Sequence, residues 1–407
     1  MKKFISLLLA LLLSISCLSG CVNILLPEYT PSIDLAEPFI GFRAESKRGV
    51  DLETYTRVDL ADLETYESPL ASYGASYYYD TLQPQEQTLY RIVQYAMDHA
   101  MRCLFIDERV LPNIEEEVDL ILHCLALDHP LLEQNLYWSH GMATVEFPNP
   151  NPFSKAPGQS VTGVILDISE FSPEKWAKKE QAIQKAEEIL QDLPADGTDR
   201  EKAEHIYRYL GNNVEYFVAE DRGPERDYLY DALLEGKTLC DGFSNAFSLL
   251  CNMAGIPCVE KMHTQKEDEA DRSGHTWNAV QLGGIWYNVD ATGAKEVKEK
   301  HPRLVHFGFA DEMLEHSVDY EDRAPKCEDY LQPPDVIITK SGKAGSMVKD
   351  AWKTVKKTGR AYVIARFPDG KQTDSVMQKI ANSLGKGFSY YLETTQTGEA
   401  IYYIFPK

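Results

Sequence analysis

The sequence predicts an α+β protein built around a helix that begins at a cysteine and an antiparallel hairpin that follows it. After Cys240, apolar residues recur at helical spacing as far as Ala254, so a buried helix is expected to begin at the cysteine. The strand-like runs 277–282 and 285–290 are separated by two glycines, a typical signal of a two-residue hairpin. Helical and strand-like segments flank this centre on both sides, which completes the α+β class.

The hairpin is expected to bring a histidine and an aspartate together. If Leu282 pairs with Ile285, then Trp277 lies opposite Asp290, and His275 lies diagonally across from Asp290 on the same face. Diagonal neighbours are about 7–8 Å apart between backbones, a span that an imidazole and a carboxylate can close. A slip of one residue would move one partner to the other face.

A thiol, an imidazole and a carboxylate in this arrangement suit nucleophilic catalysis. The positive end of the helix dipole and the unpaired N–H groups favour the thiolate of Cys240. Cys240 would attack an acyl carbon, His275 would hold or accept its proton, and Asp290 would fix the imidazole tautomer. Trp277 and Trp286 fall near the same site in this register and could shield it from water. Each residue alone is more often structural, so the prediction depends on the combination.

The segment from about 201 to 327 resembles the transglutaminase-like core, a relative of the papain-type thiol enzymes. The motifs that carry the resemblance are 239–243 with its helix, 275–278, 286–292, and upstream 205–210 and 213–216. The resemblance implies a papain/transglutaminase-like core, in which a helix bearing the cysteine packs on an antiparallel sheet bearing the histidine and the aspartate. It also implies Cys240 as nucleophile, His275 as general acid/base and Asp290 as orienting carboxylate.

The oxyanion hole is less evident from the sequence. Thr276 stands where the family usually has alanine, and no upstream Trp or Gln completes the hole. The backbone N–H of the nucleophile or of Asp241 could supply one donor. A tyrosine such as Tyr216, Tyr228 or Tyr230 could supply the second.

The resemblance implies an enzyme that performs acyl transfer at an amide. The cysteine would form a thioester on a glutamine side chain or a peptide carbonyl, and water or a second amine would resolve it, giving hydrolysis or crosslinking. A cysteine peptidase that acts on cell-wall peptides or proteins is a close alternative. A transglutaminase-like scaffold that binds peptides without turning them over is an alternative of a different class. In each case the expected partner is a peptide or protein.

The N-terminus predicts export and a lipid anchor. A short basic region precedes an apolar run over 4–13, which has the length of a signal peptide. Residues 18–21 resemble a bacterial lipobox, so residues 1–20 are expected to be removed and Cys21 to carry the lipid. Two acyl chains suffice for stable attachment to a membrane leaflet. An extracytoplasmic, lipid-anchored protein is expected, with an ordinary secretory signal as the alternative.

Composition divides the rest of the chain into four parts. They are a tether over 21–69, an α/β extension over 70–200, the catalytic core over 201–330 and a small domain over 335–407. The extension is expected to hold helices over 82–99 and 114–127, and a capping box at Thr198 and Glu201 begins a later helix. The last part has the order β-α-β-α-β-β and follows the linker Pro333–Pro334.

Charge limits the partners. The net charge is −22, and loss of the two signal-peptide lysines would make it −24, which argues against non-specific binding to nucleic acid. The segment 335–407 carries twelve Lys and Arg against six Asp and Glu. This basic domain either docks on the acidic body, which is the simpler account, or contacts anionic wall polymers or peptides.

No cofactor or metal is expected. No spacing of cysteines and histidines resembles a zinc site, and the acidic run 267–271 is interpreted as a solvated loop. Export permits disulfides, for which Cys251 with Cys258, or Cys103 with Cys124, are possible pairs. A reducing habitat would leave these thiols free.

Overall fold

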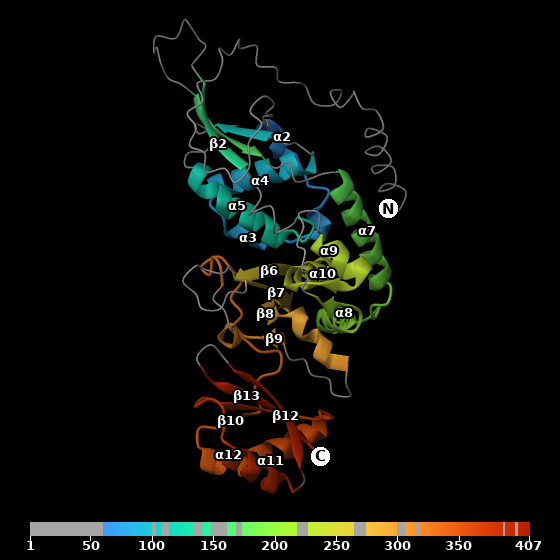
Figure 1. The fold of residues 1–407 in the computed structure, drawn as a ribbon, viewed down its shortest axis with the longest axis vertical. Helices are drawn as coiled ribbons and strands as arrows, with labels where there is room; N and C mark the ends of the chain where they lie inside the picture. The colour runs from blue at the N-terminus through green and yellow to red at the C-terminus, as the bar shows by residue number, and fades with distance from the viewer. Residues whose placement is uncertain are drawn as a thin grey trace, which may run out of the picture.

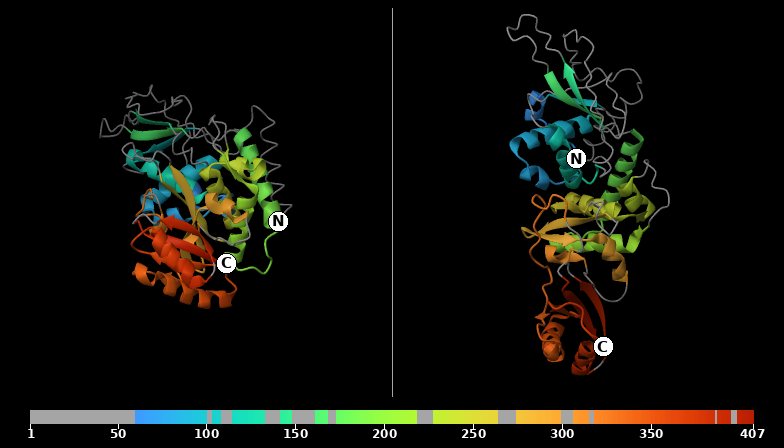
Figure 2. Two further views of the ribbon diagram at one scale, coloured as in Figure 1. Left: turned by 60° about the horizontal axis from the view of Figure 1, so that its bottom comes forward. Right: turned by 60° about the vertical axis from the view of Figure 1, so that its left-hand side comes forward.

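The computed structural model describes residues 60–99, 103–107, 114–132, 141–147, 161–167, 173–217, 227–263, 274–298, 306–314, 318–385, 387–394 and 398–407. The expected signal peptide, Cys21 and the tether as far as residue 59 lie outside the described residues. Three units follow one another along the long axis of the molecule, with the core between the N-terminal unit and the C-terminal domain (Figure 1). The same order is visible in the right-hand view of Figure 2.

The N-terminal unit packs helices against a small sheet. Its elements are α2 (Leu60–Glu64), η1 (Ala71–Tyr73), α3 (Tyr77–Thr81), α4 (Pro84–Asp98), β1 (Cys103–Asp107), α5 (Ile114–Asp128), β2 (Gly141–Phe147) and β3 (Val161–Asp167). The two predicted helices are found as α4 and α5, and the strands form an antiparallel sheet in the order β1-β3-β2. Leu63 and Tyr66 pack in the same apolar cluster as α4 and α5, so the end of the expected tether is part of the folded body.

The described part of the core combines seven helical segments with a four-stranded sheet. The helical segments are α7 (Pro173–Leu190), α8 (Asp199–Asn213), α9 (Tyr228–Tyr230), η2 (Asp231–Glu235), α10 (Cys240–Met253), η3 (Ala291–Lys298) and η4 (Asp311–Met313). The strands are β4 (Glu215–Tyr216), β5 (Lys237–Thr238), β6 (Cys258–His263), β7 (His275–Leu282), β8 (Ile285–Val289) and β9 (Phe307–Phe309). Strands β6 to β9 pair antiparallel in sequence order, and β4 pairs with β5 in parallel. The predicted capping box of Thr198 and Glu201 begins α8.

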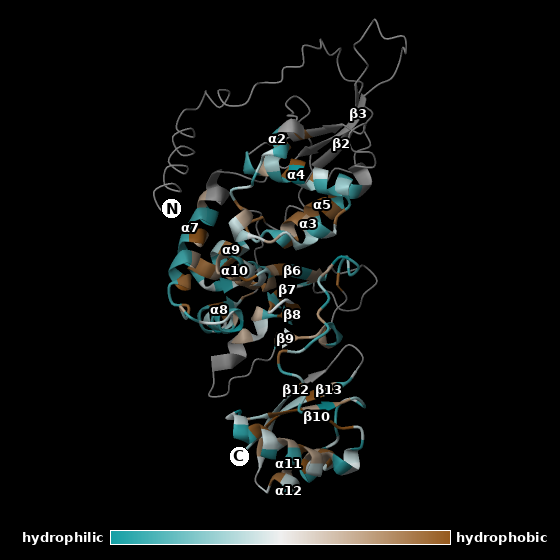
Figure 3. Cartoon of the chain, turned by 180° about the vertical axis from the view of Figure 1, so that it is seen from behind, coloured by the Kyte–Doolittle hydropathy of each residue, from teal (hydrophilic) through white to brown (hydrophobic). Residues whose placement is uncertain are grey.

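Different partners bury the two faces of the core sheet. Side chains alternate between the faces along each strand. Val280 and Val289 lie in the apolar cluster of α10, whereas Val259 and Ala279 lie in the cluster of the N-terminal unit. Figure 3 shows strongly hydrophobic stretches in α5, α10 and the strands between them. The sheet is therefore held from both sides, which fixes the strands that carry the candidate site.

The edge of this sheet at β6 is covered within the chain. The Tyr78 hydroxyl donates to the carbonyl oxygen of Glu260 at 2.8 Å, and the N–H of Asp319 donates to that of Met262 at 2.8 Å. These bonds satisfy carbonyl groups that an open edge would leave for another strand.

The C-terminal domain has the predicted order of elements. They are β10 (Val336–Ile337), η5 (Ser341–Lys343), α11 (Ala344–Val355), η6 (Lys356–Thr358), β11 (Val363–Phe367), α12 (Asp374–Leu384), β12 (Phe388–Thr394) and β13 (Ala400–Pro406). The sheet order is β10-β11-β13-β12, with the two helices packed on one face. On the other face Ile364, Ile401 and Phe405 pack against Met313 of the core. The domain thus docks on the body, as expected, with its sheet.

Among the residues that the structure describes, no helix combines the length and the apolar character that a transmembrane span needs.

Candidate active site

Cys240 is the first residue of α10, as the helical spacing predicts. The residue before it is extended, and Cys240 itself is 8% exposed. Gly242 lets the helix begin close to its neighbours, because a Cβ there would lie 2.0 Å from Thr238 Oγ1 and 2.4 Å from the carbonyl oxygen of Tyr228. The first turn of α10 is therefore packed closely against Thr238 and Tyr228.

The hairpin carries His275 and Asp290 in the predicted register. Leu282 pairs with Ile285, and the rest of β7 and β8 follows in step. Both turn glycines have positive φ, 62° and 85°, as a two-residue turn of this kind requires. His275 Nε2 lies 3.0 Å from Asp290 Oδ2, so the diagonal pair closes as expected.

In space, the imidazole of His275 lies between the thiol of Cys240 and the carboxylate of Asp290. His275 shares a side-chain hydrogen bond with Cys240 as well as with Asp290. Because Nε2 faces the carboxylate, Nδ1 is the ring nitrogen left for the thiol. The imidazole thus joins the start of α10 to the end of β8.

The imidazole and the carboxylate hold each other in the charged form. Burial by itself would lower the pKa of His275, but hydrogen bonds with Asp290 and Cys240 raise that pKa to about 10. Burial would raise the pKa of Asp290, but the hydrogen bond and positive charge of His275 lower it to about 2. Both shifts describe one ion pair, whose energy is counted once.

Asp290 is fixed by its own neighbourhood. Its Oδ1 accepts from the N–H of Thr292 at 3.0 Å and from the Thr292 hydroxyl at 2.5 Å, which leaves Oδ2 for the imidazole. Its N–H donates to the carbonyl oxygen of His306 at 2.8 Å. His306 has a φ of 62°, a conformation that is uncommon for residues other than glycine. The carboxylate therefore cannot turn away from His275 without breaking local bonds.

The face of β7 opposite His275 ties the strand to α10. The Thr276 hydroxyl donates to Asp241 Oδ1 at 2.9 Å, and Asn278 Nδ2 donates to the carbonyl oxygen of Ser244 at 3.1 Å. Asp241, a candidate for the substrate-binding region, thus has a side chain engaged in the fold. Its backbone N–H remains in the first turn of α10. Thr276, where the family usually has alanine, thus provides a hydrogen bond that ties the start of α10 to β7.

Tyr216 is the candidate tyrosine that lies at the nucleophile. Strand β4 places it beside Thr238 of β5, and its ring stacks on Phe243 of α10 with centroids 6.3 Å apart. Burial, the charge of Cys240 and a side-chain hydrogen bond with Cys240 raise the pKa of Tyr216 to about 12. The residue is still 42% exposed, so a tyrosine that interacts with Cys240 also lies at the surface.

Two other tyrosine candidates take different places. Tyr228 contributes its carbonyl oxygen, which accepts from the Thr238 hydroxyl at 3.2 Å. The ring of Tyr230 lies 5.8 Å from Lys178 Nζ of α7. These observed contacts belong to the packing around the start of α10.

Trp286, the other tryptophan expected near the site, makes its observed ring contact with the N-terminal unit. Its ring packs against Tyr77 of the N-terminal unit, with centroids 5.0 Å apart. It shares a face with Asp290 but lies four residues away along the strand, about 13 Å at 3.3 Å per residue. Trp277, in contrast, stacks on His275 with ring centroids 5.9 Å apart and is 1% exposed. It covers one face of the imidazole.

The described residues contain no group of three or more His, Cys, Asp or Glu side chains suited to a metal ion. The acidic run 267–271 and the side chain of Cys103 lie outside the described residues. Cys251 and Cys258 are free and buried. Burial and then a hydrogen bond from Cys251 raise the pKa of Cys258 well above its usual range, so the two thiols are neighbours.

Sequence reasoning missed residues that support the site. Asn288 accepts a hydrogen bond from Trp277 Nε1 at 3.1 Å, and Lys261 Nζ lies 3.1 Å from the same Asn288 oxygen. The signal for Asn288 was available, because it precedes Asp290 by two residues and so shares its face. Nothing in the local sequence indicates that Lys261 points to this place.

Residues 184–291 match the sequence model of the transglutaminase-like superfamily. The kyphoscoliosis peptidase of Homo sapiens is 28% identical over 144 residues, which cover 33% of this chain and 22% of that protein. The kyphoscoliosis peptidase of Mus musculus is 30% identical over 115 residues, which cover 26% and 17% respectively. The chain thus spans about a fifth of the length of these curated relatives.

Among solved structures, the periplasmic domain of TgpA from Pseudomonas aeruginosa is similar over 38% of this chain and 70% of that chain, at 13% identity and a TM-score of 0.23. Residues 184–291, which hold the cysteine, histidine and aspartate of the candidate site, are therefore a transglutaminase-like domain.

Proposed function

We propose that this chain is a cysteine enzyme that transfers or hydrolyses acyl groups at amide bonds of peptides or proteins. The observation that carries the proposal is His275, which bonds Asp290 on one side and Cys240, at a helix start, on the other. This is the arrangement of nucleophile, base and orienting group that nucleophilic catalysis requires. It supports a papain/transglutaminase-like core as the catalytic fold.

The proposed reaction has two halves. The Cys240 sulfur adds to the amide carbon, His275 gives a proton to the leaving nitrogen, and ammonia or an amine departs as the thioester forms. Water or a second amine then adds to the thioester while His275 accepts its proton, and the thiolate leaves. Asp290 stabilises the imidazolium in both halves. The products are an acid in hydrolysis and a new amide in crosslinking.

The tetrahedral intermediates need donors for a negative oxygen. We assign one to the backbone N–H groups of the first turn of α10, at Cys240 or Asp241, and the second to the Tyr216 hydroxyl. Tyr216 already bonds the sulfur, so a small rotation of its side chain brings the hydroxyl to an oxygen on the adjacent carbon. Replacement by Phe should lower the rate about 10- to 1000-fold.

The exposed surface beside the sulfur suits a peptide side chain. Tyr216 and Phe217 are 42% and 43% exposed, and Lys237 Nζ lies 5.7 Å from the centre of the Phe217 ring. Both rings are large and exposed, and Phe217 directly follows Tyr216, the candidate oxyanion donor. We assign them to the contact with substrate.

A cysteine peptidase is the second candidate. It is favoured by the curated relatives of the domain, which are named as peptidases. The same residues would act on a backbone amide instead of a side-chain amide. On the basis of the N-terminal sequence, we further propose that Cys21 carries a lipid and holds the enzyme outside the cytoplasm at the membrane.

The first experiment measures the alkylation of Cys240 by iodoacetamide at pH 6 and pH 9, followed by mass spectrometry of its peptide. A free thiol with a pKa near 8.5 is only about 0.3% thiolate at pH 6. We expect Cys240 to react at least about tenfold faster than such a thiol at pH 6, and His275→Ala to abolish this advantage. His205→Ala, a histidine of α8 outside the site, is the matched control. A Cys240 that reacts no faster than a free thiol would contradict the proposal and favour a peptide-binding scaffold.

The second experiment separates the candidate reactions. The protein is incubated with a glutamine peptide and a labelled primary amine. Incorporation of the label indicates crosslinking, ammonia without incorporation indicates side-chain hydrolysis, and new peptide termini indicate a peptidase. Cys240→Ser should remove whichever product is found.

A further inference from the structure

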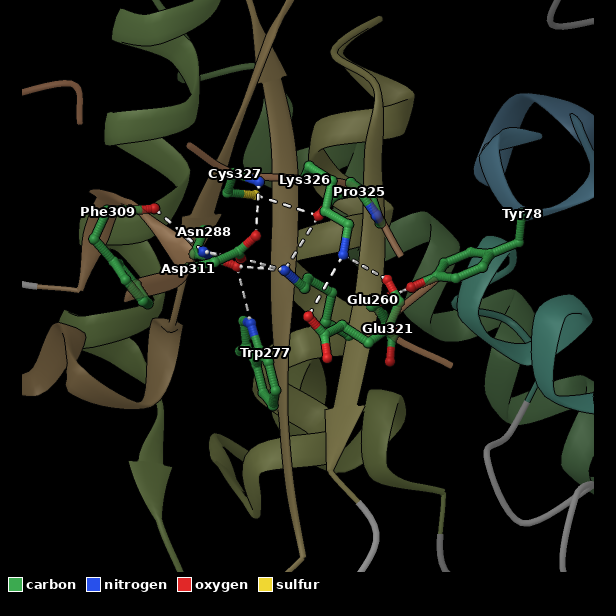
Figure 4. A network of polar contacts seen from close by, with 11 residues as sticks. Tyr78, Glu260, Trp277, Asn288, Phe309, Asp311, Glu321, Pro325, Lys326 and Cys327 are labelled. Carbon is green, nitrogen blue, oxygen red and sulfur yellow. Dashed lines mark hydrogen bonds and ion pairs between the residues drawn. The ribbon is translucent and has the colours of Figure 1, made fainter. Parts of the chain in front are cut away.

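A network of polar side chains adjoins Trp277, the residue whose ring stacks on the His275 imidazole. Trp277, Asn288, Asp311 and Cys327 gather on one side of the sheet, joined by hydrogen bonds (Figure 4). At the centre, Lys261 Nζ lies 3.1 Å from Asn288 Oδ1, 2.7 Å from Asp311 Oδ1 and 3.3 Å from the Pro325 carbonyl oxygen. Lys261 is 1% exposed, so a full positive charge is kept inside the protein.

The polar groups of this network have nearly all the partners that they can take. The three protons of the Lys261 ammonium have three acceptors. Asn288 Oδ1 accepts from Lys261 and from Trp277 Nε1, while its Nδ2 donates to Asp311 Oδ1 at 2.9 Å and to the Phe309 carbonyl oxygen at 3.3 Å. A network so complete has one low-energy arrangement, because any rotation of the amide leaves buried groups unpaired.

This arrangement reaches the catalytic imidazole through one side chain. The bond from Trp277 Nε1 to Asn288 fixes the indole, and the indole stacks on His275 at an interplanar angle of 18°. Trp277 follows His275 by two residues on β7, and Asn288 precedes Asp290 by two residues on β8. The network is therefore the next layer of the face that carries the histidine and the carboxylate.

The same network reaches the C-terminal domain through the three residues of η4. Asp311 enters the network, and its Oδ2 also accepts from the N–H of Cys327 at 2.9 Å. The next residue, Glu312, makes two bonds with Arg366 of β11, at 2.9 and 3.0 Å. Met313 packs on the sheet of the C-terminal domain. A displacement of the domain would thus act on the segment that holds Asp311.

We propose that Lys261, Asn288 and Asp311 position the His275 imidazole through Trp277, and that the docked C-terminal domain holds this network in place through η4. The inference rests on the proposed function, since it assigns these residues to the orientation of its base. None of the three contacts the reacting atoms. They are positioning residues, and the C-terminal domain gains a role in the activity of the core.

The test follows the pH dependence of Cys240 alkylation in the full chain. The titratable groups around the imidazole include Cys240, Asp241, Asp290 and Tyr216, with His263, the residue paired with His275 on β6, and His306, whose charge acts on Asp290. None of them is altered by the variants. Lys261→Met removes the charge and keeps the bulk, and we expect the alkylation rate at pH 6 to fall about tenfold while the rate at pH 9 is unchanged. Unfolded protein would give a similar pattern, because its exposed Cys240 reacts as a free thiol, so both rates are compared only for variants whose circular dichroism spectrum shows them to be folded.

Two further variants keep the test decisive. Trp277→Phe removes the N–H that bonds Asn288 together with one ring of the indole, keeps an aromatic ring beside His275, and is used if Lys261→Met does not fold. Arg366→Gln breaks the contact with Glu312 and also the ion pair with Glu399 within the domain. We expect a two- to tenfold fall at pH 6, the size of coupling carried between sites. The matched controls are Lys179→Met, which breaks a buried ion pair with Asp227, and Arg360→Gln, which breaks a pair with Asp335 inside the domain. Both controls should keep the wild-type ratio of the two rates.

The outcomes are distinct. A folded Lys261→Met or Trp277→Phe protein with the wild-type ratio of rates would overturn the positioning role. A wild-type ratio in Arg366→Gln, with a shift in Lys261→Met, would overturn the role of the C-terminal domain. Failure of the proposed function is separate, because then the wild-type protein itself would react no faster than a free thiol at pH 6.

Discussion

Asp128 of the N-terminal unit and Asp290 of the core are two largely buried carboxylates with opposite chemistry. Asp128 accepts from the N–H groups of Tyr78 and Tyr79 at 3.0 and 2.9 Å and from the Tyr90 hydroxyl at 3.1 Å. Burial nevertheless raises its pKa to about 7. Asp290 has a similar number of bonds, yet its pKa falls to about 2, because one of its partners is the His275 imidazolium.

The difference shows that neutral donors alone do not keep a buried carboxylate charged at this depth. Asp128 fastens the start of α3 to the end of α5, where a neutral acid serves as well as an anion. Asp290 must be an anion to hold the imidazole in the orientation that faces the sulfur. The charge of Asp290 therefore depends on its imidazolium partner, whereas the link made by Asp128 needs only dipoles.

The largest effect should come from removing the charge of Asp290. In Asp290→Asn the amide keeps its volume but no longer stabilises the imidazolium, so kcat/KM should fall about 10³- to 10⁴-fold. The rate is measured with the peptide substrate that the product assay identifies. Asp128→Asn is the matched control and should retain wild-type kcat/KM per folded molecule. An equal fall in both variants would remove the distinction between the two carboxylates.

The two carboxylates should also give opposite pH dependences of the free energy of unfolding. The folded-state pKa of Asp290 lies below the unfolded value of 3.8, so its stabilisation is complete above that value and is lost as the pH falls toward 2. The folded-state pKa of Asp128 lies above it, so its contribution is complete below pH 3.8 and is lost as the pH rises through 7. Each unit of difference between the folded-state and unfolded-state pKa changes the free energy of unfolding by about 1.4 kcal/mol.

Urea unfolding of the wild type and both Asn variants between pH 3 and 8 checks these signs. The difference between wild type and Asp128→Asn should shrink from pH 4 to pH 7. The difference between wild type and Asp290→Asn should instead grow between pH 3 and pH 5. Parallel curves in the three proteins would show that neither carboxylate titrates as described.

A smaller loss of stability is expected from Asp128→Ala. The substitution leaves two backbone N–H groups and one hydroxyl without their acceptor, at about 1–3 kcal/mol for each buried group before water enters. A net loss of about 3 kcal/mol in the free energy of unfolding follows, measured in urea at pH 5, with activity per folded molecule unchanged. Asp80→Ala, an exposed carboxylate of α3, is the control and should change stability by less than about 0.5 kcal/mol. A loss for Asp128→Ala no larger than that of the control would show that α3 needs no such link.

The candidate site could be predicted where local geometry determines it. Two glycines and strand alternation were sufficient for the register of the hairpin, and hence for the approach of His275 to Asp290. Helical spacing was sufficient for the start of α10 at Cys240. These features depend on residues within one element or one turn, so few alternatives compete with them.

The rest of the site depends on packing between distant segments. Trp286 was placed on the right face, but alternation does not tell which neighbouring unit covers a given point of that face. Three tyrosines were equally acceptable as oxyanion donors until the pairing of β4 with β5 brought Tyr216 to the sulfur. Lys261 meets Asp311 across fifty residues, a contact that no periodic pattern indicates. Sequence thus predicts the reacting groups better than the residues that hold them.

Tyr90→Phe should have the smallest effect and bears most closely on why Asp128 and Asp290 differ. It removes one neutral donor from Asp128 and leaves the two backbone bonds, so the free energy of unfolding should fall by about 1 kcal/mol. Because that hydroxyl favours the anion, its loss should also raise the pKa of Asp128 further, so the decline of stability, which starts at the unfolded pKa, should continue to a slightly higher pH. Urea unfolding between pH 5 and 8 measures both effects, with Tyr79→Phe, a neighbouring tyrosine on α3, as control. A decline that ends at a lower pH would mean that the hydroxyl favours the neutral acid, and the contrast between dipoles and a cation would then need a different basis.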